Sequence, residues 1–306
     1  MSSLGPVLKA AALGCLVLVW GTTWAAITIS LRGIPPFTGV AARFAIAAII
    51  LLVYARLLGI SLAAATRRHR NLRILHAVLT FCVSYGLVFW AEQWVPSGLA
   101  SVLFATFPLL VAILAHFVLP GERMTAPVLA GIILGFAGIA VIFAEDFELL
   151  GGPAVATASL VMLLSPLAGA IVSVSVKRWG SGMHPVPFNA AAMVMAAAIM
   201  GVLAAAIERR RPVVLDPGPV AALLYMAVVG TAVTFPLYFW LLEHMEARRL
   251  ALIGYGTPVV ALMIGAVFMG EPTTGRTWLG STMVIVGVAV ASRAGGHGKR
   301  IGPGKD

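Results

Sequence analysis

Aromatic and hydroxyl side chains are the residues of this 306-residue chain whose types and spacing could form a binding site. Trp20, Thr23 and Trp24 stand at positions i, i+3 and i+4, which share one face of an α-helix, and similar faces recur in later apolar stretches. Because a hydroxyl that faces lipid lacks a partner, these side chains are expected to point into a helix bundle. There they would either line a cavity for a neutral or aromatic solute or pack helix against helix. The candidate substrate-binding residues are Trp20, Thr23, Trp24, Phe81, Ser84, Tyr85, Phe89, Thr234, Tyr238 and Tyr255.

Arg43 is the one strong charge deep inside an apolar stretch. An arginine at the centre of a membrane helix costs about 2.5 to 3.5 kcal/mol, so its side chain should face the bundle interior or water. Its guanidinium offers paired donors that suit the carboxylate of a substrate. The alternative is that it reaches outward to the near end of its helix or bonds to loop carbonyls.

Neither a catalytic nor a metal site can be assembled from the remaining polar residues. Cys15 and Cys82 lie inside apolar runs, and nothing in the sequence has the spacing of metal ligands. Ser101 and His116 share one predicted helix, where a rise of 1.5 Å per residue separates them by more than about 20 Å. The sequence therefore predicts a protein without metal or cofactor that is not an enzyme.

Composition excludes a soluble protein. Hydrophobic residues make up 60% of the chain, charged residues only 10%, and the mean hydropathy is +1.01. A soluble domain carries about 25% charged residues, so this chain cannot coat a water-facing surface. The net charge of +10 comes from short basic clusters between apolar runs, and these do not form the solvated platform that nucleic acid needs. The expected partners are the lipid bilayer and a small-molecule substrate, with no nucleic acid.

Ten apolar stretches of about twenty residues predict ten transmembrane helices. Short connections rich in Pro and Gly separate them, and the period-two alternation of a β-barrel is missing. The predicted fold class is an all-α polytopic membrane protein. The predicted spans are 10–31, 37–58, 74–94, 97–119, 126–144, 154–176, 186–207, 219–242, 250–269 and 277–292.

The distribution of the 21 Lys and Arg residues predicts the orientation. Most of them lie in the terminal segments and in the connections that follow even-numbered spans. Because cytoplasmic segments carry an excess of Lys and Arg, we expect both termini on the cytoplasmic side of a bacterial inner membrane. The cluster Arg209–Arg211 runs against this bias without reversing it.

The chain also repeats itself at a shift of 149 or 150 residues. Each half holds five predicted helices, and an odd number means that the second half enters the membrane upside down. Inverted repeats are typical of secondary transporters, whose substrate sits near the midplane between the halves. We expect repeats at 1–148 and 149–306. The matched pairs are Phe89-Trp90 with Phe239-Trp240, Pro108 with Pro258, Gly121-Glu122 with Gly270-Glu271, Gly131 with Gly280, and Gly138 with Gly287.

Pro108 and Pro258 occupy matching places in the two halves. Each proline removes a backbone donor and frees a carbonyl, so a kink is expected in its helix. The pair would serve either as two hinges of a moving bundle or as static kinks that shape it.

The motifs together resemble the EamA domain of the drug/metabolite transporter superfamily. In the first half the resemblance rests on Trp20-Gly21, Arg43-Phe44 and the block from Trp94 through Gly138. In the second half it rests on Tyr255-Gly256-Thr257-Pro258 and Gly270-Glu271-Pro272, while Ser165-Pro166 replaces the Trp-Gly pair. The two similar copies span roughly 10–145 and 155–292.

The resemblance implies a secondary transporter that works by alternating access and exports neutral or aromatic amino acids, such as threonine, methionine and phenylalanine, and related small metabolites. The small multidrug pumps of the same superfamily use a glutamate in their first helix, whereas 10–31 holds no acidic residue. This difference favours facilitated transport. Gly131 and Gly135 form a small-residue face on the fifth predicted helix, and we expect it to pack within one chain, which favours a monomer. The alternatives are a proton-coupled efflux pump, an intramembrane enzyme, a receptor or channel, and a dimeric assembly.

Overall fold

The computed structural model describes residues 6–64, 66–120, 124–144, 150–244 and 252–294. Across these ranges the regular secondary-structure elements are all helices. Eight helical stretches are long and apolar enough to cross a membrane, and the shorter apolar helices Gly256–Phe268 and Gly275–Ala291 complete the series. Each of these stretches falls on one of the ten predicted spans, so the all-α membrane fold class is confirmed.

Six of the stretches run as single helices and four are interrupted. The single helices are α1 (Pro6–Leu31), α2 (Pro36–Leu57), α7 (Ala126–Phe143), α10 (Pro185–Ile207), α14 (Leu252–Phe268) and α15 (Gly275–Ala294). The interrupted stretches are α3–η1–α4 (Arg67–Leu75, His76–Ser84, Tyr85–Ala91), α5–α6 (Ser97–Phe104, Phe107–Val118), α8–α9 (Pro153–Met162, Leu164–Trp179) and α11–η3–α12 (Pro217–Ala227, Val228–Val233, Thr234–His244).

Proline explains three of the interruptions. A proline clashes with the carbonyl four residues earlier. Pro108 therefore clashes with the carbonyl of Phe104, where α5 ends. Pro166 likewise clashes with the carbonyl of Met162, where α8 ends. Pro236 clashes in the same way with a carbonyl inside the wide-turned segment η3. In contrast, α14 continues through Pro258.

The two π-helical segments fall in matching places of the repeat. η1 covers His76–Ser84, and η3 covers Val228–Val233, which corresponds to residues 78–83 at the shift of 150. Such segments are rare and occur frequently at functional sites. Their recurrence shows that the two halves share backbone geometry as well as sequence motifs.

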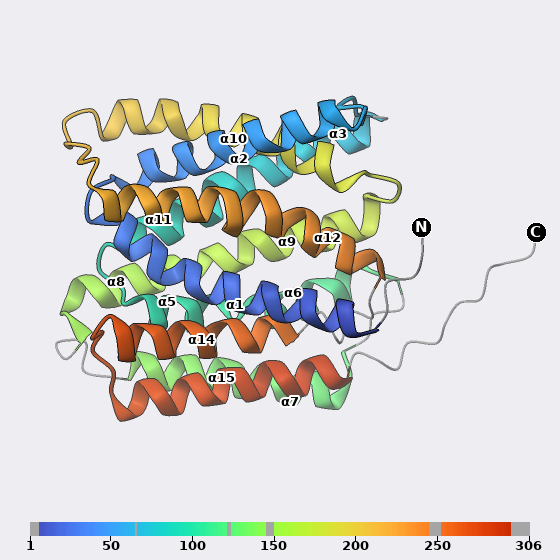
Figure 1. The fold of residues 1–306 in the computed structure, drawn as a ribbon. Coiled ribbons are helices and arrows are strands. Elements are labelled where there is room, and N and C mark those ends of the chain that lie inside the picture. Colours follow the sequence, from blue (N-terminus) through green and yellow to red (C-terminus); the bar gives the residue numbers. More distant parts are fainter. Residues whose placement is uncertain (1–5, 65, 121–123, 145–149, 245–251, 295–306) are drawn as a thin grey trace, which may run out of the picture.

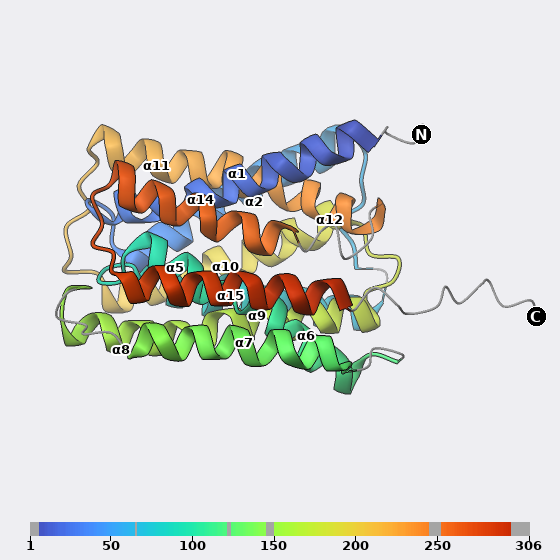
Figure 2. The same cartoon turned by 90° about the horizontal axis from the view of Figure 1, so that it is seen from below.

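At both edges of the bundle a helix of the first repeat packs against its own counterpart in the second repeat. α2 packs along α10 at one edge of the bundle, and α7 packs along α15 at the opposite edge (Figure 1). Between these edges α1 lies against α14 and α11, and its counterpart α9 lies against α6 and η1 (Figure 2). We call the end at which α1 begins and α15 ends the proximal end, and the end at which α2 begins the distal end.

Glycines hold the α7–α15 pair at close range. A Cβ on Gly131 would lie 2.5 Å from the Gly287 carbonyl oxygen, and one on Gly138 would lie 2.6 Å from that of Gly280. In the repeat, Gly280 corresponds to Gly131 and Gly287 corresponds to Gly138. Gly131 therefore contacts the counterpart of Gly138, and Gly138 contacts the counterpart of Gly131. This exchange is the contact expected across a two-fold axis between inverted halves. Small residues that let backbones approach are a common device of membrane helix packing.

We expect Gly138→Ala to lower the stability of the purified protein by about 2 kcal/mol, because the added methyl forces the two helices apart. The control is Gly14→Ala in α1, where a Cβ would meet nothing within 4 Å. That substitution should be neutral or slightly stabilising, since alanine favours helix. Thermal unfolding in detergent measures both variants, and equal melting temperatures would contradict the close contact.

Candidate functional site

Predicted residues of the first and eighth spans meet in the middle of the bundle. The indole Nε1 of Trp20 donates a hydrogen bond to the hydroxyl of Thr234 over 3.0 Å. Its ring lies 5.4 Å from the ring of Tyr238 and 5.9 Å from that of Phe235, measured between centroids. The structure thus brings together Trp20, Thr234 and Tyr238, which the sequence places far apart.

Phe81 connects this group to the third span. Its side chain is fully buried, and its ring lies 5.4 Å from that of Phe235 and 4.6 Å from that of Phe44. Tyr85 completes the arrangement, with its ring nearly perpendicular to Phe44 at 5.1 Å. The rings pack directly on one another in this conformation. The central cluster is defined here as Trp20, Arg43, Phe44, Phe81, Tyr85, Thr234, Phe235 and Tyr238.

Arg43 is buried at the edge of the central cluster, with 1% of its side chain exposed. Its Nε donates to the Thr231 hydroxyl over 2.9 Å, and its Nη2 donates to the Gly230 carbonyl oxygen over 3.4 Å. The Nη1 contacts the sulfur of Met226 at 3.7 Å, and the guanidinium lies 4.8 Å from the centroid of the Tyr85 ring. The interpretation that Arg43 reaches outward along its helix is therefore wrong.

The partners of Arg43 lie in or beside η3. Thr231 donates its hydroxyl to the carbonyl oxygen of Met226 over 2.8 Å while it accepts from Arg43. The guanidinium therefore supports a segment whose wide turns depart from the regular helical ladder. A guanidinium carries five N–H donors, and three of them are used in these contacts. A substrate carboxylate would have to bind the others.

Other candidate residues are placed in helix contacts outside the central cluster. Thr23 donates its hydroxyl to the Trp20 carbonyl within α1, and Trp24 packs on Phe104 at 5.5 Å. Ser84 and Ser165 share a hydrogen bond of 2.8 Å between η1 and α9. Phe89 is fully buried against α2 beside Gly39. The side chain of Tyr255 lies outside the described residues.

Two polar contacts were not anticipated from the sequence. The hydroxyls of Thr22 and Tyr225 lie 2.5 Å apart and join α1 to α11. His76 lies 3.2 Å from the side-chain oxygen of Asn189 and stacks on Phe188. A polar residue inside an apolar stretch is a usable signal for such pairs, but the sequence does not say which two residues pair.

Pro108 of the fourth span lies against the start of the ninth span, one helical turn before Pro258. A Cβ on Gly254, four residues before Pro258, would come 2.9 Å from Cγ of Pro108. The first turn of α6 therefore meets the start of α14 at these residues. The hinge role of Pro108 and Pro258 stays a prediction.

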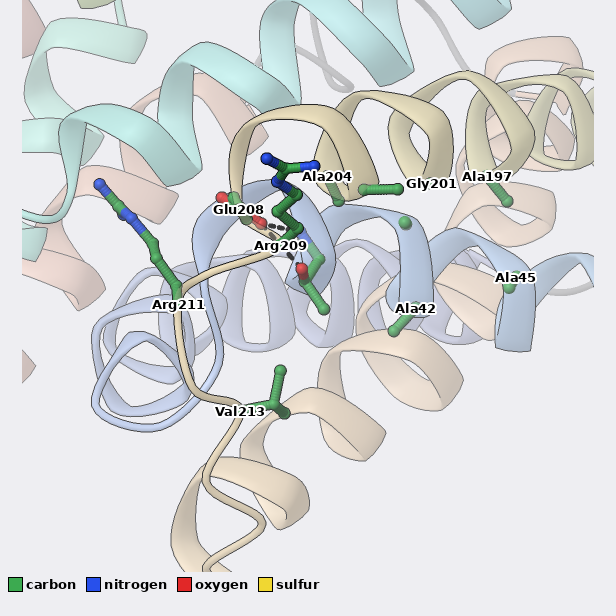
Figure 3. A pocket seen from close by; sticks show the side chains of 12 residues that line it. Ala42, Ala45, Ala197, Gly201, Ala204, Glu208, Arg209, Arg211 and Val213 are labelled. Carbon is green, nitrogen blue, oxygen red and sulfur yellow. Dashed lines mark hydrogen bonds between the residues drawn. The ribbon is translucent and has the colours of Figure 1, made fainter.

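A groove of about 520 Å³ lies between α2 and α10, apart from the central cluster. Small side chains such as Ala42, Ala45 and Gly201 form its walls, and Arg209 and Arg211 stand at its distal rim (Figure 3). Among the described residues no group of three or more His, Cys, Asp or Glu could hold a metal ion.

Two inverted sets of membrane helices around a shared aromatic cluster form an architecture that is typical of membrane transporters. The profile of the EamA-like transporter family matches the chain twice, at residues 8–144 and 156–293. The chain belongs to this family of membrane transporters.

Relatives from two bacteria match along most of their length. The uncharacterized transporter YoaV of Bacillus subtilis (strain 168) is 26% identical over 89% of this chain and 92% of its own length. The uncharacterized inner membrane transporter YedA of Escherichia coli (strain K12) is 29% identical over 92% of this chain and 89% of its own. A solved crystal structure at 19% identity superposes with a TM-score of 0.67, covers 95% of this chain and 98% of its own, and shows the same fold.

We expect Arg43→Met to lower stability by about 2 kcal/mol, because the Gly230 carbonyl and the Thr231 hydroxyl lose a charged donor in a buried place. Arg43→Lys keeps the charge without the planar fork and should fall between this variant and the parent protein. The control is Arg32→Met, which removes an exposed charge at the distal end of the bundle. Thermal unfolding in detergent gives the comparison, and equal losses at the two positions would refute the supporting role of Arg43.

Proposed function

We propose that this transporter exports neutral and aromatic amino acids, with related small metabolites, by alternating access and facilitated diffusion. The observation that carries the proposal is the central cluster, in which side chains from both repeats meet. Trp20, Phe44 and Phe81 come from the first repeat, and Thr234, Phe235 and Tyr238 come from the second. A solute bound there would touch both halves, as alternating access requires.

The chemistry of the central cluster suits an amino acid with an uncharged side chain. Its rings offer apolar faces to an aliphatic or aromatic side chain, and Thr234 and Tyr238 supply hydroxyls. Arg43, beside the rings of Phe44 and Tyr85, would receive the carboxylate. In the present conformation the rings fill the place themselves, so substrate entry requires them to separate.

We also propose that this chain resembles the aromatic amino-acid exporter YddG, a resemblance that would fit this substrate class. The relatives YoaV and YedA carry the word transporter without a substrate in their names. YedA is named as an inner membrane protein, and we propose the same membrane for this chain, with both termini in the cytoplasm. We also propose that one chain suffices, because both halves of the cluster belong to it.

One observation favours proton coupling as a second candidate. Glu92, which follows α4, is 4% exposed, and its Oε2 accepts from Thr28 over 3.2 Å. Its Oε1 has no hydrogen-bond partner among the described residues. A buried carboxylate without full pairing is costly when charged, so it would bind a proton readily.

Counterflow in proteoliposomes tests the substrate class. Vesicles loaded with unlabelled threonine, methionine or phenylalanine should take up the labelled amino acid faster than vesicles without protein. Tyr238→Ala should raise the KM about tenfold, since a ring contact and its area are lost. Phe89→Leu, at a buried position outside the cluster, is the control and should leave the KM within about twofold. Uptake at the protein-free rate for all three amino acids would refute the proposal.

An imposed pH gradient separates the two candidates. Facilitated transport predicts that the gradient drives no accumulation and that Glu92→Gln retains counterflow. Proton coupling predicts accumulation against the concentration gradient, and Glu92→Gln would abolish it while counterflow persists. Accumulation of the labelled amino acid is measured in the same vesicles with and without the pH gradient. Accumulation that the gradient drives and that Glu92→Gln abolishes would contradict facilitated transport and support proton coupling.

A further inference from the structure

Glu271, in the connection between α14 and α15, places its carboxylate at the N-terminus of α5. Gly270 adopts a left-handed conformation at φ +64°, and the Glu271 N–H bonds back to the Gly265 carbonyl over 2.9 Å. The turn directs the Glu271 side chain to α5, where its two oxygens accept from the backbone N–H groups of Ser97 and Gly98 over 2.9 and 3.0 Å. A carboxylate at a helix N-terminus satisfies free donors and matches the helix dipole.

Glycines let the two helices meet around this carboxylate. A Cβ on Gly98 would lie 3.0 Å from Cα of Leu262 in α14, and one on Gly265 would lie 3.4 Å from the Gly98 N and closer still to the Glu271 carboxylate. α5 and α14 are therefore in backbone contact at the distal end, with Glu271 bonded across them. These helices belong to the fourth and ninth spans, which carry Pro108 and Pro258.

A chemically similar contact lies at the same end between two other helices. Glu208, just past α10, accepts from the backbone N–H groups of Phe37 and Thr38 and from the Thr38 hydroxyl, over 2.8 to 2.9 Å. That contact lies within the α2–α10 edge pair, whose helices pack along each other for most of their length. The two glutamates thus make the same bonds, one inside a continuous pair and one across the central helices.

We propose that Glu271 is the lock that holds the distal gate of the transporter closed. The inference rests on the proposed alternating access, because opening the distal end requires α5 and α14 to separate. Separation would break two charge-assisted hydrogen bonds together and leave the N-terminal donors of α5 free. Glu208 stabilises the scaffold by the same chemistry without opposing this movement. Glu271 is therefore a positioning residue that sets how often the distal end opens.

Distances between spin labels at the distal end test the lock. Cysteines replace Trp94, just before α5, and Phe268, at the end of α14, in a background with Cys15→Ser and Cys82→Ser. Both label positions are exposed, at 42% and 81%. Glu271→Gln removes the charge and places an amide N–H₂ beside backbone donors, so the population at longer distance should rise about tenfold in lipid nanodiscs. Glu208→Gln, the matched control, should lower the melting temperature but keep the same distance distribution as the parent protein.

Gly265→Ala provides a second variant that keeps the charge of Glu271, because its methyl would displace the carboxylate from Ser97 and Gly98. It should lengthen the distances in the same direction as Glu271→Gln. An unchanged distribution in both variants, or an equal shift in Glu208→Gln, would overturn the lock. The distances require no substrate, so they decide this inference independently of the counterflow measurement. Counterflow with unchanged distances would leave the proposed function in place and remove only the lock.

Discussion

Lipid hydrocarbon supplies no hydrogen-bond partners, so polar groups that these helices carry into the membrane must be satisfied inside the bundle. The contacts of Arg43 and Trp20 follow this constraint. Arg43 bonds to Gly230 and Thr231, and Trp20 bonds to Thr234. Because each of these bonds joins the two repeats, the cost of leaving a polar group unpaired ties the halves together at the place where the central cluster forms.

The same constraint accounts for the irregular backbone. Proline removes donors in the fourth, sixth and eighth spans, and turns or π-helical segments stand where regular bonding stops. The carbonyl of Gly230, in one such segment, receives the Arg43 guanidinium. Irregular membrane helices are tolerated only where the surrounding protein supplies partners, so they concentrate at the centre of the bundle, while the edge pairs α2–α10 and α7–α15 consist of unbroken helices.

This division suggests separate mechanical roles. The edge pairs pack along their length, and α7 and α15 approach closely at Gly131, Gly138, Gly280 and Gly287. α5 and α14 meet at their distal ends, where Gly98 and Gly265 approach each other around Glu271. Long pairs provide a stable frame, and short contacts held by a few bonds can exchange, which is the pattern that the proposed alternating access needs.

Much of the fold was predictable from the sequence, because hydrophobic length is a local property that lipid thickness imposes on each helix. The ten spans, the motif repeat and the helical face that carries Trp20 needed no tertiary information. Pairing did need it. The sequence does not say which hydroxyl faces Trp20, that Arg43 turns inward to η3, or that Phe81 and Phe235 link the third and eighth spans. All three depend on how the helices rotate and cross. Those rotations are decided by contacts between residues far apart in the chain, and periodicity along one helix does not contain them.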